Sequence, residues 1–226
     1  KKLCNRKFGI GSDGLILLQN KDGYDFEMIF FNPDGSKSLC GNGSRCIVEF
    51  ARTLGIVKDK ISFVTFDGAH EAQFKNGMVS VKMKDVTSVE TGENYFFLNT
   101  GSPHYCVFVN DLEQYDVYES GKKIRNSERF KKEGANVNFI QKNGASVFVR
   151  TYERGVENET LSCGTGVTAS ALAASLKGVS TSENYCDIKT LGGNLKVRFK
   201  KNAGNSFSDI WLDGPAAYVF KGEIEI

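Results

Sequence analysis

Two cysteines in the 226-residue sequence stand in the same local context. Cys40 and Cys163 each begin a Cys-Gly-x-Gly run that leads into a predicted helix. The first helix has apolar residues at helical spacing, and the second has apolar or small residues on almost every side, which predicts a buried helix. Backbone N–H groups at a helix N-terminus lack partners within the helix, and the helix dipole favours an anion there. A cysteine at such a position is expected to have a lowered pKa and an accessible thiolate. The pattern predicts two reactive thiols, each beside a site for a carboxylate.

Two opposed thiols can invert a stereocentre. A thiolate on one face of a carbon removes a proton while a thiol on the other face supplies one, which is general acid–base catalysis. If that carbon adjoins a carboxylate, the developing negative charge lies on the carboxylate oxygens, where helix N-termini would stabilise it. Buried packing is the alternative reading of any free cysteine. The repeated glycine context favours chemistry at Cys40 and Cys163, and we expect the remaining cysteines to be packing residues: Cys4, Cys46, Cys106 and Cys186.

The composition excludes several classes of protein. The net charge is +2 and the charged residues are interspersed, which argues against nucleic-acid and anionic-membrane partners. No apolar run is long enough to span a membrane. Six cysteines without a C-x-x-C motif, together with only two histidines, argue against a disulfide scaffold or a zinc site. We therefore expect a reduced, cytoplasmic compartment. The chain begins at Lys1 without an initiator Met, so we also expect its natural N-terminus to be missing.

A glycine-rich stretch near the start matches the dinucleotide fingerprint G-x-G-x-x-G at residues 9–14. That fingerprint requires a helix to follow it. Here an aliphatic run at residues 15–18 follows, which is typical of a short buried strand. We interpret the glycines as a turn and do not expect nucleotide binding.

The remaining pattern predicts an α+β protein with two similar halves. Each half combines strands in hairpins with one helix that begins at a Cys-Gly-x-Gly turn. A polar stretch at residues 86–94 marks the boundary, giving domains at 1–88 and 89–216, with a last strand at 217–226 that returns to the first domain. We expect helices at 43–54 and 166–176, a partly helical stretch at 111–129, and strands at 15–18, 24–31, 61–66, 70–74, 78–83, 96–98, 105–109, 136–141, 146–152, 185–191, 195–200 and 209–212.

Other polar residues accompany the two cysteines. Glu153 and Arg154 lie ten and nine residues before Cys163. Arginine can bind a carboxylate through two parallel hydrogen bonds and glutamate can hold an ammonium group, although a surface ion pair is the simpler reading. Asn32 and Asn136 are either site residues or turn residues. His104 is either a supporting base or a structural histidine.

Taken together, the motifs resemble the diaminopimelate epimerase family. They occur in the family's order, at residues 8–14, 31–35, 40–46, 103–104, 136–139, 152–155 and 163–166. The resemblance implies a cofactor-free, PLP-independent and metal-free isomerase that interconverts LL- and meso-2,6-diaminopimelate in lysine and peptidoglycan biosynthesis. It also implies two similar domains, each a mostly antiparallel barrel-like sheet around a central helix, with the substrate in a cleft and a homodimeric assembly.

The resemblance also assigns roles to residues. In the LL-to-meso direction, Cys163 would accept the proton and Cys40 would donate one. Glu153 would hold the reacting amino group and His104 would support catalysis. The reacting carboxylate would be bound by Gly41, Asn42, Gly164 and Thr165, and the distal centre would be recognised by Asn32, Asn136 and Arg154.

The sequence departs from the family pattern at two places. The family opens with Gly-x-Gly-Asn-Asp-Phe, which is absent here, so we expect the first strands of the fold to be missing. Ser102 stands where the family often has Asn before Pro-His, and a serine can still form a hydrogen bond at shorter reach.

Two other functions stay open. The first is a proline or hydroxyproline racemase of the same fold, a family that usually has His after the first Cys-Gly and lacks Glu-Arg-Gly before the second cysteine. The second is a non-catalytic amino-acid-binding relative. Asn42, Glu153 and Arg154 favour diaminopimelate.

Overall fold

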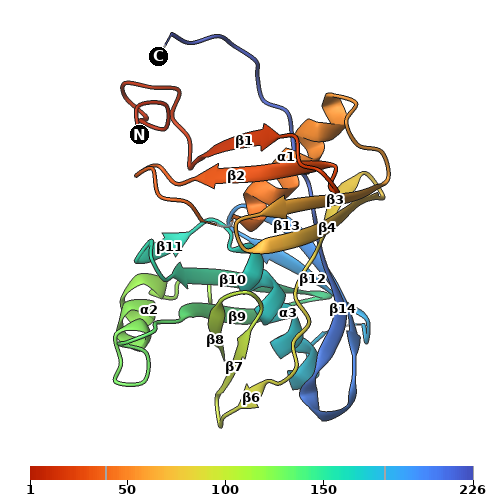
Figure 1. Ribbon diagram of the computed structural model, residues 1–226. Helices are drawn as coiled ribbons and strands as arrows, with labels where there is room; N and C mark the ends of the chain where they lie inside the picture. Colours follow the sequence, from red (N-terminus) through yellow and green to blue (C-terminus); the bar gives the residue numbers. More distant parts are fainter. Residues whose placement is uncertain (39, 181, 226) are drawn as a thin grey trace. The chain divides into compact units, whose positions relative to one another are not determined.

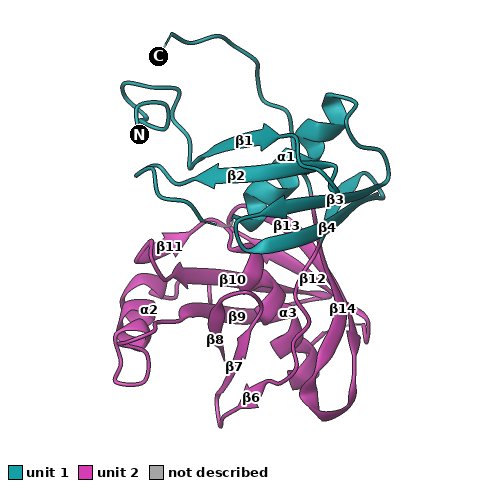
Figure 2. Ribbon diagram, in the orientation of Figure 1, with its two compact units in different colours: residues 1–81, 215–226 teal, residues 82–214 magenta. Residues whose placement is uncertain are grey.

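The computed structural model describes residues 1–38, 40–180 and 182–225. The chain divides into two compact units, the first formed by residues 1–81 with 215–226 and the second by residues 82–214 (Figure 2). The chain passes from the first unit to the second just before the polar stretch at residues 86–94.

The first unit is a sheet with one crossover helix (Figure 1). Its elements are β1 (Leu15–Gln19), β2 (Phe26–Phe31), α1 (Gly41–Thr53), β3 (Lys60–Thr65), β4 (Gly68–Lys75) and β5 (Met78–Lys82). The strands lie in the order β1-β2-β3-β4-β5; β2 and β3 run parallel and the other neighbours antiparallel. Because parallel neighbours need a crossover connection, α1 follows directly from the β2–β3 pairing. The strand β1 also confirms that the glycine-rich stretch at 9–14 leads into a strand. None of its residues is buried, because β1 lies at the edge of the sheet, so the expectation of a buried strand is wrong.

Helix α1 buries one face and exposes the other. Ile47, Val48 and Ala51 pack into the core of the first unit with strand residues such as Phe63. Cys46 belongs to the opposite face and is exposed, as is Phe50 one turn later. The expectation that Cys46 is a packing residue is therefore wrong, because at 3.6 residues per turn positions 46 and 50 point away from the sheet. Cys4, Cys106 and Cys186 are buried as predicted.

The second unit is a larger sheet with two helical crossovers (Figure 1). Its elements are β6 (Glu90–Thr91), β7 (Tyr95–Asn99), β8 (Pro103–Phe108), α2 (Val117–Arg125), β9 (Asn136–Asn143), β10 (Ser146–Glu153), β11 (Asn158–Thr160), α3 (Gly164–Lys177), β12 (Tyr185–Thr190), β13 (Gly193–Lys201), the 3₁₀ turn η1 (Ala203–Asn205) and β14 (Phe207–Gly214). The strands lie in the order β14-β13-β12-β10-β9-β8-β7-β6, with β11 paired to β10. The pairs β8–β9 and β10–β12 are parallel, and α2 and α3 are their crossovers.

Helix α3 is enclosed by this curved sheet. It contacts β7, β8, β9, β10, β12, β13 and β14. Val167 and Leu172 are fully buried, and so are the alanines at 169, 171, 173 and 174. Small residues on almost every side let the strands approach the helix from several directions, which confirms the sequence-based prediction of a buried helix.

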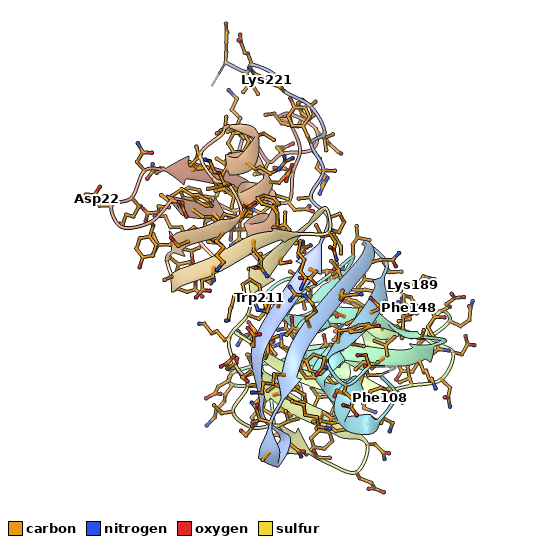
Figure 3. All side chains as sticks on the ribbon, turned by 90° about the vertical axis from the view of Figure 1, so that its right-hand side faces the viewer. Asp22, Phe108, Phe148, Lys189, Trp211 and Lys221 are labelled. Atoms are coloured by element: carbon orange, nitrogen blue, oxygen red, sulfur yellow. The ribbon has the colours of Figure 1, made fainter. Side chains whose placement is uncertain are left out.

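Several side-chain contacts of the second unit lie outside the core around α3. Tyr152 and Phe139 form a separate buried cluster beneath α2. Figure 3 shows Phe148 and Lys189 beside each other, with the Lys189 ammonium 5.2 Å from the centre of the Phe148 ring. The guanidinium group of Arg198 lies in the same way over the ring of Trp211 on β14, 5.7 Å from the ring centre. These contacts stabilise the sheet and involve none of the predicted site residues.

The C-terminal segment contradicts one expectation. Residues 217–225 form no strand, and Tyr218, Val219 and Phe220 are exposed. A strand persists only where a neighbour takes up its backbone hydrogen bonds. Within the described residues no strand pairs with this segment, which runs as an extended coil in Figure 1. The predicted strand at 217–226 is therefore wrong over the described residues. Separately, no helix among the described residues has the length and apolar character needed to cross a lipid bilayer.

Candidate active site

Cys40 caps the N-terminus of α1. Its backbone is extended, with φ −122° and ψ 109°, and its Sγ accepts a hydrogen bond from the N–H of Gly43 at 3.3 Å. Its carbonyl oxygen accepts the first helical hydrogen bond, from Ser44 N at 2.8 Å. The thiol therefore occupies the place of an N-cap side chain and lies at the positive end of the helix dipole.

A buried cation lies one turn into the same helix. Arg45 is 6 % exposed, and its Nη2 donates to the Asn42 side-chain oxygen at 2.8 Å. Burial lowers the pKa of the Arg45 guanidinium, while Cys46 and Cys40 act in the opposite direction. Sequence reasoning missed Arg45. Arg45 lies three residues after Asn42, and residues at this spacing are neighbours on a helix, so the spacing could have indicated their contact.

Asn32 lies in the turn that precedes Cys40. Its Nδ2 donates to Ser36 Oγ at 3.0 Å, and its Oδ1 accepts from Ser38 Oγ at 3.0 Å. The side chain thus holds its own turn, which agrees with the turn-residue interpretation. A role towards substrate stays a prediction.

Cys163 occupies the N-cap position of α3, as Cys40 does in α1, but its side chain forms no capping hydrogen bond. Its backbone is again extended, with φ −109° and ψ 114°, and its carbonyl oxygen accepts from Val167 N at 2.8 Å. The Cys163 Sγ lies 3.5 Å from Thr165 Oγ1. The turn is tied to the loop before β8, because Thr100 Oγ1 donates to the Thr165 carbonyl oxygen at 2.8 Å. Gly164 is buried, and its carbonyl oxygen accepts a side-chain hydrogen bond within α3.

The protonation state of Cys163 differs from the expectation. Burial raises the pKa of the Cys163 thiol to about 12, and the nearby Glu153 carboxylate adds to the effect. The Thr165 hydroxyl and the Gly166 N–H, both close to the thiol, oppose the shift in pKa. The predicted lowering of the pKa at a helix N-terminus is therefore wrong for Cys163, because loss of hydration outweighs the helix field. In the ligand-free protein this cysteine is a neutral thiol at pH 7.

Glu153 stands at the end of β10 and faces the Cys163 thiol. Its carboxylate accepts hydrogen bonds from the hydroxyl of Thr160 and from Cys163. Burial raises the pKa of Glu153, and these two hydrogen bonds lower it. The neighbouring Arg154 turns elsewhere, since its Nη1 donates to the backbone oxygen of Glu133 at 2.7 Å. The surface ion pair considered for residues 153 and 154 is therefore not how these side chains are arranged.

The remaining predicted residues of the second unit lie on adjacent strands. The Oδ1 of Asn136 accepts from the backbone N–H of Arg154 at 2.9 Å, and its Nδ2 donates to Pro103 O at 3.4 Å. Ser102 is half-buried in the loop between β7 and β8, and its carbonyl oxygen accepts from Thr100 N. Asn136 thus links the start of β8 to the residue that follows the end of β10, next to Glu153.

His104 is fully buried. Its Nδ1 lies 3.1 Å from the side-chain nitrogen of Asn138, and its Nε2 has no protein partner among the described residues. Burial lowers the pKa of His104 to about 3, the positive charge of Arg154 adds to this, and the contact with Asn138 opposes it. The ring is therefore neutral at pH 7. Sequence reasoning missed Asn138, although its spacing of two residues from Asn136 places both on one face of β9.

The described residues offer no metal site, since no three His, Cys, Asp or Glu side chains among them lie close enough to share an ion. What the second unit does bring together is Cys163, Glu153 and Thr165 at the start of α3. In the first unit, Cys40, Asn42 and Arg45 form the corresponding group at the start of α1. Each group can hold a carboxylate against helix N–H groups beside a thiol.

A family model described as diaminopimelate epimerase matches residues 1–93 and 96–219. The chain belongs to the diaminopimelate epimerase family. Its sequence is 49 % identical over 228 residues to the diaminopimelate epimerase of Flavobacterium psychrophilum, covering 99 % of this chain and 88 % of that protein. It is 40 % identical to the diaminopimelate epimerase of Aquifex aeolicus, covering 99 % and 84 % of the two chains. The family suggested by the sequence motifs is thereby confirmed.

Solved structures agree on the fold. A PhzF-family phenazine biosynthesis protein of Bacillus anthracis superposes with a TM-score of 0.75 at 14 % identity, over 96 % of this chain and 86 % of that one. A hydroxyproline epimerase from Agrobacterium vitis superposes with a TM-score of 0.70 at 16 % identity, over 97 % and 78 %. At such identities the similarity concerns the fold alone, and it confirms the predicted α+β class with two barrel-like domains.

Proposed function

We propose that this chain interconverts LL- and meso-2,6-diaminopimelate, with Cys40 and Cys163 as its two acid–base groups. The observation that carries the proposal is the pair of N-cap cysteines, one in each unit, with matching extended backbones and Gly-x-Gly turns. The substrate follows from membership of the family. Asn42, Glu153 and Arg154 supply the motif positions that distinguish this substrate from proline.

The proposed reaction exchanges one proton at the α-carbon. The thiolate of one cysteine takes the proton, and the electron pair of the broken C–H bond moves into the adjacent carboxylate. The thiol of the other cysteine then protonates the opposite face, so that the configuration inverts. Backbone N–H groups at the two helix starts stabilise the charge on the carboxylate oxygens. For LL to meso, Cys163 is the base and Cys40 the acid, and the carboxylate is bound at Gly41, Asn42, Gly164 and Thr165.

Glu153 has a specific role in the proposed reaction, because its negative charge contributes to the raised pKa of Cys163. In the ligand-free protein the Glu153 carboxylate disfavours a thiolate at Cys163. We assign the substrate ammonium group to Glu153. A positive charge bound there cancels the repulsion, so that Cys163 ionises more readily once substrate is present. The Cys163 thiolate, which acts as the base, is thus formed when the substrate is bound.

The finer assignments belong to the same proposal. His104 supports the reaction, and the distal centre is recognised by Asn32, Asn136 and Arg154. Ser102 also binds the substrate. The enzyme works without pyridoxal phosphate or another cofactor, as a cytoplasmic homodimer that supplies lysine biosynthesis. Family membership supports these statements.

Solvent exchange tests the proposal. In D₂O, the α-proton signal of LL-diaminopimelate should disappear from the NMR spectrum as deuterium enters the α-carbon. Cys40→Ala and Cys163→Ala should each abolish conversion to the meso form. Cys46→Ala is the matched control, because Cys46 lies on the same helix as Cys40 but on its exposed face. Full conversion by either of the first two variants would contradict the two-thiol reaction.

The same assay separates the alternative functions. Exchange into proline or hydroxyproline, with none into diaminopimelate, would identify a racemase of the same fold. Exchange into no α-amino acid, with retained binding of diaminopimelate, would identify a binding protein.

A further inference from the structure

A buried row of polar side chains crosses three strands of the second unit. In the sheet register, Asn138 on β9 lies opposite Cys106 on β8 and opposite Thr151 on β10. His104 lies two positions before Cys106, on the same face of β8. This face meets α3, because a β-carbon at Gly166 would lie 2.4 Å from the Asn138 side-chain oxygen. His104 and Asn138 are both 0 % exposed.

The contacts of Asn138 determine which way its carboxamide points. Its oxygen accepts from Thr151 Oγ1 at 3.0 Å. Its nitrogen lies on the opposite side, 3.5 Å from the backbone oxygen of Tyr105 and 3.6 Å from Cys106 Sγ. A carbonyl oxygen can only accept hydrogen bonds, so the NH₂ group belongs on the side of Tyr105. That same NH₂ group lies 3.1 Å from His104 Nδ1.

The carboxamide orientation then determines the tautomer of His104. A neutral imidazole has one donor and one acceptor nitrogen. Because the Asn138 NH₂ donates, His104 Nδ1 has to accept, and the ring proton belongs on Nε2. Nε2 is the ring atom that is buried without a protein partner in the described chain. A buried donor of this kind calls for an explanation, and an acceptor supplied by a ligand is one.

We propose that Asn138 is a positioning residue that holds His104 as the neutral Nε2–H tautomer, so that the ring offers a hydrogen-bond donor to an acceptor atom that arrives with the substrate. His104 then stabilises negative charge during the reaction and removes no proton itself. The tautomer assignment stands on the contacts alone, whereas its use in catalysis rests on the proposed epimerase function.

Nitrogen NMR tests the tautomer directly. The chain has two histidines, so His70→Gln leaves His104 as the sole source of imidazole signals. In ¹⁵N-histidine-labelled protein, Nε2 should show a protonated, pyrrole-type shift and Nδ1 a pyridine-type shift, without change between pH 5 and pH 8. A proton on Nδ1, or titration of the ring within that range, would overturn the assignment.

Substitutions at Asn138 test its role. Asn138→Asp replaces the donor with a carboxylate, so the ring proton should move to Nδ1 and kcat should fall about 100-fold, as for loss of one transition-state donor. Asn138→Ala, which neither donates nor accepts, should show a mixture of tautomers. Thr151→Val is the matched control for the spectrum, because it removes a partner of Asn138 while leaving the NH₂ group in place, and the proton should stay on Nε2.

The outcomes separate this inference from the proposed function. If Asn138→Asp keeps the proton on Nε2, or keeps the kcat of the parent protein, Asn138 does not position His104. If no variant or parent protein exchanges diaminopimelate while the spectra are as expected, the tautomer assignment holds and the catalytic use fails with the proposed function. If the parent protein exchanges diaminopimelate while its His104 carries the ring proton on Nδ1, the function stands and this inference falls.

Discussion

A β-carbon on Gly166 would lie 2.4 Å from the side-chain oxygen of Asn138 and 3.2 Å from the β-carbon of Cys163. This oxygen cannot easily move away, because hydrogen bonds to Thr151 and His104 hold the Asn138 side chain in place. The second glycine of the Cys163 turn is thus required by the packing of α3 against β9. It also lets the cysteine lie close to the polar row of strand residues.

We therefore expect Gly166→Ala to destabilise the protein. Glycine to alanine inside a helix normally stabilises by up to about 1 kcal/mol. Here the clash should reverse the sign and cost about 1–3 kcal/mol, as overpacking of a core does. Urea unfolding measures the difference. Gly43→Ala is the matched comparison, because its nearest neighbours lie at 3.2–3.3 Å and include the flexible ends of Ile16 and Met28. Equal effects at the two positions would contradict this account.

The thiol of Cys163 should react slowly in the ligand-free protein. Its pKa of about 12 leaves little thiolate at pH 8, so alkylation by iodoacetamide should accelerate steadily as the pH rises. Glu153→Gln removes the neighbouring negative charge and should increase the rate at pH 8. Glu157→Gln, in the exposed turn after β10, is the control that should leave the rate unchanged. Mass spectrometry resolves modification at Cys163 from that at exposed Cys46, and fast modification of Cys163 at pH 7 would disprove the raised pKa.

His104 should make the fold sensitive to acid. Its pKa is about 3 in the folded protein against an ordinary value of 6.5. Below pH 6.5 the unfolded chain takes up a proton on this residue before the folded chain does, so the free energy of unfolding should fall as the pH drops towards 3. The contribution is at most about 5 kcal/mol. Urea unfolding between pH 7 and pH 4 should show a flatter dependence for His104→Gln, and identical pH dependences would refute the buried neutral ring.

Arg150 should be a major contributor to stability. Its Nη1 donates to the backbone oxygens of Leu112 and Tyr115 at 2.7 and 3.0 Å, and its Nε and Nη2 donate to both carboxylate oxygens of Glu159. Arg150→Met should cost about 2–4 kcal/mol, because it leaves a partly buried carboxylate unpaired. Arg150→Lys should recover little, since an ammonium group lacks the planar fork.

The control for Arg150 is another arginine–carboxylate pair of the same chain. Arg6 bonds Asp13, and both side chains are largely exposed to solvent. Arg6→Ala should therefore change the free energy of unfolding by less than about 1 kcal/mol. Chemical unfolding of both variants gives the comparison, and a similar loss in each would show that burial does not set the value of the Arg150 contacts.

Local features of the sequence were sufficient to predict much of the fold. Two Cys-Gly-x-Gly runs put Cys40 and Cys163 at the N-termini of α1 and α3. Helical spacing of apolar residues located α1, and apolar or small residues on almost every side located α3. Most strands of both units were found from runs of apolar and β-branched residues, whereas the short strands β6 and β11 were not predicted. The exposed side of α1 and the terminal segment were not predicted correctly. Exposure of Cys46 depends on which side of the helix meets the sheet, and a strand at 217–226 would depend on a partner that the segment itself cannot specify.

The sequence alone determined the identity and local setting of the two thiols, because a glycine turn and a helix start are properties of a few consecutive residues. Only the tertiary structure decided their chemical state. Glu153 reaches Cys163 from the end of β10, and Asn138 reaches His104 from the neighbouring strand β9. At Cys163, burial and the neighbouring charge shift the pKa by more than the helix field does, and both depend on how strands and helices pack together.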